Sequence, residues 1–346
     1  MFDVLLFVFL FLLAFLSVYL MFVSNLLALT LLTTLISLIS TALYMLLNAV
    51  DVAITEAAVG AGVSTVLSIV IIYLTSSYFF SRKDNQSTKF KTTHLNRFIY
   101  GIPFVIMLYI FIESIASMPV FGELGNPTNN ILYKTYLQGS FHIFHVHNAV
   151  TMILGSYRGY DTLGETLVIL LAALGVYLIL LQNNPASLHT PRISTPLDVL
   201  NKRFTFFVPI NFLFTILPIL LVFAAYVQFH GDFGPGGGFQ AGILLATPYI
   251  LYFLFYGSKN VEGLVTTNTL IYLIALGVLI YSLTGVVTLA LGGAYLDYYV
   301  LGFSNQHSYH YGLFAIEFGV GMTVFTSMYL IINEFFVQIQ FQEKYL

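Results

Sequence analysis

The sequence predicts an all-α integral membrane protein of about nine transmembrane helices, and two observations predict it. The first is composition: of 346 residues, 58% are hydrophobic and only 8% are charged, with a mean hydropathy of +0.90. A soluble domain carries about 25% charged residues, so 12 Lys and Arg with 15 Asp and Glu cannot cover a water-soluble surface of this size. The second is a series of apolar segments, each near the ~20 residues that a helix needs to cross the hydrocarbon core.

The segments are too long for barrel strands, so helices are the structure that satisfies their backbone polar groups in lipid. The first segment lacks a basic stretch before its apolar run, and we expect an uncleaved span rather than a signal peptide. The nine expected spans are 2–23, 25–48, 53–80, 98–117, 164–182, 205–228, 239–256, 268–292 and 312–336.

The positive charges predict the orientation. With these spans, ten of the twelve Lys and Arg residues fall on one side, which should be the cytoplasm, and only Lys134 and Arg158 fall opposite. The N-terminus is then outside and the C-terminus cytoplasmic. A tenth span at 141–155 would reverse everything downstream and contains three histidines, so we expect that segment to be interfacial or re-entrant.

Two basic polar linkers, 81–97 and 183–204, divide the chain into three blocks. No internal repeat relates the blocks, and corresponding broken helices, typical of inverted-repeat carriers, are not found. The expected domains are a three-span domain at 1–80, a two-span domain at 98–182 with a long external loop at 118–163, and a four-span domain at 205–346.

The first stretch with residues that could take part in chemistry lies at the start of the third span. Asp51 precedes it, and Glu56 lies about a turn and a half inside, where a carboxylate is costly unless it faces protein or water. Gly60 and Gly62 remove side chains from the next turn, which favours close helix approach or a local π-bulge. A role in moving protons or cations and an interfacial carboxylate with packing residues are both open.

The second stretch leads into the fifth span. Arg158 and Asp161 are three residues apart in an expected turn and are spaced to pair. Glu165 enters the membrane in the first helical turn, where the helix dipole favours an anion. A simple cap and turn is the alternative.

The third stretch links the sixth and seventh spans. His230 and Asp232 are either a pH-sensitive external pair or part of a polar turn. The glycines predict a tight turn with close backbone approach, and no Lys-Ser/Thr follows them, so a phosphate loop is not expected. The turn and its helix-packing positions are Pro235, Gly236, Gly237, Gly238 and Gly242.

The fourth stretch is Glu317, beside Gly319 and Gly321 in the last span; Glu113 is shallower. The histidines at 142, 145 and 147 have no nearby acid, so no metal site is expected. The chain has no cysteine, which excludes disulfides and cysteine-held clusters in it, and no basic patch for nucleic acid. We expect no cofactor.

Three motifs resemble known membrane modules. DVAITEAAVGAG at 51–62 resembles the D-type domain at the C-terminal end of the A-type subunit of Mrp cation/proton antiporters, and NAVTMILGSYRGYDTLGE at 148–165 is similar to the E-type domain that follows it. FHGDFGPGGGFQAG at 229–242 with IEFGVG at 316–321 resembles the B-type subunit, the MnhB family. Membrane-bound hydrogenases contain the same modules.

The resemblance implies a subunit of a multisubunit sodium/proton antiporter in the cytoplasmic membrane. It implies Na⁺ and H⁺ as transported ions, lipid as surroundings and other Mrp-type subunits as partners. The large antiporter-like part of the A-type subunit is absent, so a separate large subunit is expected. A hydrogenase or complex-I-like redox-driven pump and a non-conducting scaffold are the alternatives. By motif, the ion-path candidates are Glu56, Asp161, Glu165 and Glu317, with Asp51 as a helper.

Overall fold

The computed structural model of this chain is helical almost throughout the residues that it describes, which contain no β-strand. The chain forms two compact units, Met1–Thr75 with Ser140–Leu346, and Ser76–Gly139. The described residues are 2–69, 71–72, 94–120, 122–183, 210–256, 265–302 and 305–345.

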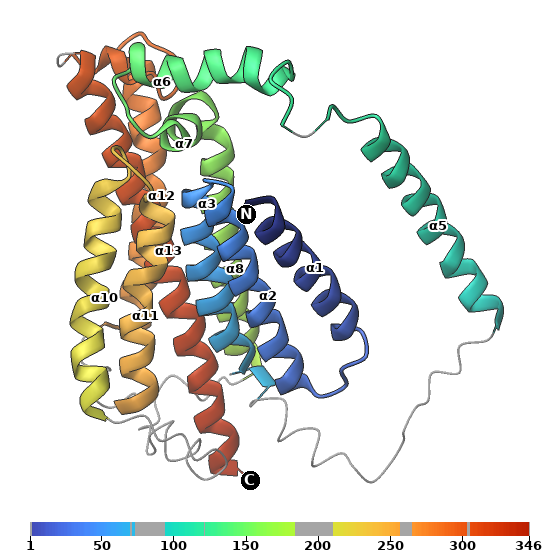
Figure 1. Cartoon of the computed structure of the whole chain (residues 1–346). Helices are drawn as coiled ribbons and strands as arrows, with labels where there is room; N and C mark the ends of the chain where they lie inside the picture. Colours follow the sequence, from blue (N-terminus) through green and yellow to red (C-terminus); the bar gives the residue numbers. More distant parts are fainter. Residues whose placement is uncertain are drawn as a thin grey trace. The chain divides into compact units, whose positions relative to one another are not determined.

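The larger unit consists of long helices joined by turns and short helical segments (Figure 1). Its first elements are α1 (Phe2–Leu20), α2 (Leu26–Leu46), α3 (Val50–Thr55), the π-helix η1 (Glu56–Val63), α6 (Gly139–His142), α7 (Ala149–Met152), the π-helix η3 (Ile153–Tyr157) and α8 (Gly159–Asn183). Its remaining elements are α10 (Ile210–His230), α11 (Gly238–Tyr256), α12 (Thr267–Ala290), the 3₁₀-helix η6 (Tyr298–Leu301) and α13 (Asn305–Tyr345). The smaller unit contains α5 (His94–Ala116) and the π-helix η2 (Thr128–Gln138).

A helix coincides with each of the nine expected spans, which confirms the all-α membrane fold. Within the described residues, six helices are long and apolar enough to cross a membrane. The third expected span reached residue 80, but 73–80 lie outside the described residues, as do 81–93 and 184–209 with the positive charges that predict the orientation. Which side faces the cytoplasm therefore stays a prediction.

Two helices extend beyond the apolar runs that predicted them. α8 begins at Gly159 rather than at 164, and α13 covers 305–345 rather than 312–336. Polar residues flank both runs, and a helix continues into them because its backbone hydrogen bonds do not require apolar side chains.

The segment 141–155 is not a continuous span, so the tenth-span alternative is wrong. A turn at 143–148 separates α6 from α7, and His145 has a positive φ of 58°. Asn148 then caps α7 by accepting from two of its first backbone amides.

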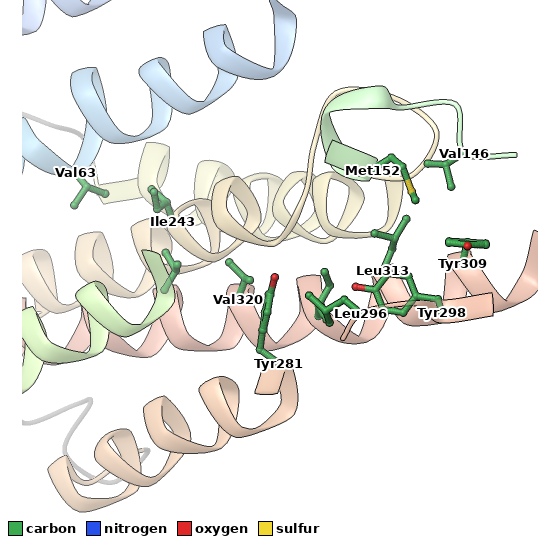
Figure 2. Close-up of a cluster of buried hydrophobic side chains, with 12 residues drawn as sticks. Val63, Val146, Met152, Ile243, Tyr281, Leu296, Tyr298, Tyr309, Leu313 and Val320 are labelled. Atoms are coloured by element: carbon green, nitrogen blue, oxygen red, sulfur yellow. The ribbon is translucent and has the colours of Figure 1, made fainter. Parts of the chain in front are cut away.

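One cluster of buried side chains draws on all three sequence blocks (Figure 2). Val63 comes from η1, Met152 from α7, Ile243 from α11, Tyr281 from α12 and Leu313 from α13. The blocks that the linkers separate in sequence therefore share a core.

The helix α13 packs against α8, α11 and α12. Glycines let two of these neighbours come close: a Cβ added at Gly242 would lie 2.6 Å from the Gly321 carbonyl oxygen, and one at Gly277 would lie 2.6 Å from that of Gly319. Lipid supplies no hydrophobic force between helices, so such close contacts matter for association.

Candidate functional site

The glycine-rich turn between α10 and α11 is the centre of the candidate site. Gly237 has a φ of 133°, which side-chain-bearing residues rarely adopt. A Cβ on Gly238 would overlap the backbone of Glu317, and one on Gly236 would lie 2.6 Å from the Val227 carbonyl oxygen. The glycines that follow Pro235 therefore allow the turn to lie directly on α13.

Asn148 fixes this turn from the second block. The residue is only 7% exposed. Its side chain donates from Nδ2 to the carbonyl oxygens of Gly231 (3.0 Å) and Gly234 (2.8 Å). Its Oδ1 accepts from the backbone amide of Val150 (2.9 Å), and Thr151 Oγ1 also donates to Gly231 (2.7 Å). One amide side chain thus caps α7 and holds a turn more than 80 residues away.

Asp51 reaches the same turn from the first block. Its Oδ1 accepts from the backbone amide of Gly236 (3.0 Å) and, at longer range, from Asn148 Nδ2 (3.4 Å). One helical turn later, Thr55 Oγ1 accepts from Gln240 Nε2 (2.9 Å) on α11. The start of α3 is therefore tied to the turn and to α11.

Glu317 approaches the turn from α13. A Cβ on Gly231 would lie 2.7 Å from Glu317 Oε2, and one on Gly237 would lie 3.4 Å from Oε1. Among the described residues, no Lys or Arg forms an ion pair with Asp51 or Glu317.

Asp232 has a histidine partner, His310, that was not among the candidates from the sequence. Its Oδ2 lies 2.9 Å from His310 Nδ1, with side chains 13% and 17% exposed, and Phe233 stacks on the His310 ring. The other oxygen, Oδ1, is buried without a hydrogen-bond partner in the described structure. His230, the neighbour suggested by sequence, instead stacks on Tyr226.

Glu56 lies apart from this turn, as the first residue of η1, where its side chain contacts α2. Its Oε1 accepts from Ser37 Oγ (2.6 Å), and a Cβ on Gly60 would lie 2.6 Å from that same oxygen. At Gly62 the nearest atom to an added Cβ would be the Ala57 carbonyl oxygen, at 3.5 Å. The helix here has the π form that the glycines favour, a form that often occurs at functional sites.

The remaining candidates lie at the start of α8. Arg158 and Asp161 form an ion pair of 2.5 Å, but both are exposed, and such pairs contribute about 0–1 kcal/mol to stability. Because α8 starts early, Asp161 is the acid of its first turn and Glu165 lies in the second. Glu165 lines a cavity of about 690 Å³ together with Glu317.

Family models match most of this chain in three pieces. The MbhD model, which describes the D-type subunit of MBH, matches residues 11–77, and the MbhE model, which describes the E-type subunit of MBH, matches residues 106–194. The model described as "Domain related to MnhB subunit of Na+/H+ antiporter" matches residues 209–330.

Similar proteins support the same family. The probable A/B-type subunit of a K⁺/H⁺ antiporter from Rhizobium meliloti is 30% identical over 40% of this chain, which spans only 15% of that relative's length. An uncharacterised protein of Methanocaldococcus jannaschii is 30% identical over 57% of this chain and 72% of its own length.

A solved structure shows the same fold. A chain of the Mrp complex from Dietzia sp. DQ12-45-1b is similar over 94% of this chain and 34% of that chain, with a TM-score of 0.63 and 19% identity. The three motif resemblances are thus confirmed, and the chain belongs to the family of membrane proteins built from MbhD-, MbhE- and MnhB-type domains, related to the A-type and B-type subunits of Mrp-type antiporters.

Proposed function

We propose that this chain is a subunit of a multisubunit Mrp-type antiporter that exchanges a monovalent cation for protons across the cell membrane. The observation that carries the proposal is the meeting of Asp51, Asp232 and Glu317, from three separate elements, at one glycine-rich turn. Glu317 lies inside the expected last span, and carboxylates at membrane depth are costly and usually mark ion or proton pathways.

The three carboxylates differ in what holds them. Asp51 accepts two hydrogen bonds that join the blocks, and Asp232 is paired with His310. Glu317 has no Lys or Arg partner in the described residues and lines a cavity, so it is the acid best placed to exchange a proton. Carboxylate oxygens are also suitable ligands for hard cations such as Na⁺.

The proposed partners follow from the part of the antiporter that this chain resembles. The match to the Rhizobium meliloti relative covers a small fraction of that protein, and the match to the Dietzia chain covers about a third. We infer that a separate large antiporter-like subunit supplies the rest of the exchange route, and that this chain alone does not restore sodium tolerance to antiporter-deficient cells.

The test uses everted membrane vesicles from cells that carry the complete complex, with a fluorescent dye that reports the pH gradient. Adding NaCl or KCl should collapse the gradient in wild-type vesicles and not in vesicles from cells lacking this chain. Glu317→Gln should assemble and lose at least about tenfold of the response, a size expected when a proton-transfer group is removed. Glu113→Gln, in the exposed part of α5, is the matched control and should respond normally.

Two other outcomes identify the alternatives. The MbhD and MbhE matches favour a redox-driven pump as the second candidate. In that case the purified complex contains iron–sulfur or nickel–iron subunits, and the cation response requires an electron donor. A full response from assembled Glu317→Gln vesicles would instead make this chain a non-conducting scaffold.

A further inference from the structure

A cavity of about 690 Å³ is lined mainly by the second and third sequence blocks, with Thr55 from the first. Its walls come from α7 and η3, the first part of α8, the start of α11 and the middle of α13. Two carboxylates on different helices line it, Glu165 of α8 and Glu317 of α13. One water takes up about 30 Å³ in the liquid, so the cavity has room for roughly twenty.

The polar side chains of the lining are two carboxylates, threonine hydroxyls and the Gln240 amide, with no cationic group among the described residues. Lys, Arg and His are all missing from the described residues that line it. Thr151 and Thr166 donate their hydroxyl protons to backbone carbonyls, so their oxygens remain as acceptors. Thr55 accepts from Gln240. A lining of acceptors and carboxylates suits water and hydronium and disfavours anions.

The cavity wall beside Glu317 is glycine backbone without side chains. Gly236, Gly237 and Gly238 all line the cavity, and a side chain at Gly237 would approach the Glu317 carboxylate to 3.4 Å. Gly155 also lines the cavity, and its carbonyl oxygen accepts from the hydroxyl of the buried Tyr298 (2.5 Å). Burial raises the pKa of Tyr298 well above the usual tyrosine value, so this hydroxyl remains a neutral donor.

We propose that this cavity is a water-filled proton relay between Glu317 and Glu165. A protonated Glu317 gives its proton to a cavity water, the hydronium charge moves along hydrogen-bonded waters, and an ionised Glu165 accepts the proton. One carboxyl loses the proton that the other gains, and the gradient sets the direction. The relay rests on the proposed function and adds a route that joins the second block to the third.

The competing occupant is a lipid acyl chain, because much of the lining is apolar. Cysteine labelling distinguishes water from lipid, and this chain has no cysteine of its own. Leu154 and Val168 line the cavity and are 41% and 65% exposed. Leu167 and Leu171 do not line it, yet are 41% and 64% exposed, which makes them matched controls.

Each of the four positions is changed to Cys in the assembled complex, in native membranes, and treated with a charged methanethiosulfonate reagent. Only a thiolate reacts, and apolar surroundings suppress the thiolate, so Leu154→Cys and Val168→Cys should react at least about tenfold faster than the controls. Equal rates would mean that lipid fills the cavity and would overturn the relay, whatever the complex transports.

The second arm measures proton flux after an imposed pH step in liposomes that contain the complex. Glu165→Gln and Glu317→Gln should each lower the flux about tenfold, and the double variant should be no slower than the slower single, because groups in series are not additive. Glu113→Gln should conduct normally. Normal flux through Glu165→Gln would overturn the relay while leaving the antiport proposal intact, and vesicles without a cation response would overturn the antiport proposal alone.

Discussion

Asn148→Ala tests whether one side chain holds the candidate site together. The substitution removes the cap of α7, worth about 1 kcal/mol. It also removes the donor to the carbonyl oxygens of Gly231 and Gly234, one buried and one partly buried hydrogen bond, worth about 1 kcal/mol each. The expected loss in the free energy of unfolding is therefore about 3 kcal/mol. Denaturant titration in detergent micelles, followed by helical circular dichroism, measures it.

Asn25→Ala is the matched control. Asn25 caps α2 in the same way, accepting from the backbone amides of Leu27 (2.9 Å) and Ala28 (3.3 Å), but it is exposed and these two hydrogen bonds stay within its own helix start. Its loss should be only the cap, about 1 kcal/mol. Equal losses for the two variants would refute the idea that Asn148 ties the second block to the turn.

Two further predictions use the same titration. Gly242→Ala should lower the free energy of unfolding by about 1–3 kcal/mol, because its Cβ would lie 2.6 Å from the Gly321 carbonyl oxygen. Gly175→Ala, whose Cβ would meet no atom within 4 Å, should instead raise it by up to about 1 kcal/mol. Similar effects of the two substitutions would contradict the close approach of α11 and α13. His310→Ala should lower the free energy of unfolding by about 1–3 kcal/mol, because it leaves Asp232 without its partner. Adding Asp232→Asn should recover part of that loss, and no recovery would argue against the pair.

The helices were predictable because lipid allows few alternatives to a continuous apolar helix. A local π-bulge at Glu56 was one of two expectations from Gly60 and Gly62, the other being close helix approach, and the structure has a π-helix there. The start of α8 and both ends of α13 were not predictable, because hydropathy detects only the apolar run. It does not detect the polar turns through which each helix continues beyond that run. His310 lies in such an extension, outside the expected span.

The site itself was only partly predictable. Asp51, Asp232 and Glu317 could be identified singly: Asp51 just before the third span, Asp232 in the glycine-rich turn, and Glu317 beside glycines inside the last span. Their meeting depends on tertiary contacts between residues far apart in the chain, such as Asn148 with Gly231, which no local pattern encodes. His310 had one signal in the sequence: it precedes Glu317 by seven residues, about two helical turns, and so shares its face.

Among the described hydrogen bonds, those that hold the turn involve the Asp51 carboxylate but not the Glu317 carboxylate. The carbonyls of Gly231 and Gly234 accept from Asn148, and the amide of Gly236 donates to Asp51, so removing Asp51 would disturb the turn as well as a charge. No backbone group of the turn depends on the Glu317 carboxylate for a described hydrogen bond, and Glu317→Gln also preserves its shape. A transport defect in Glu317→Gln can therefore be assigned to the lost proton, whereas the same defect in an Asp51 variant cannot.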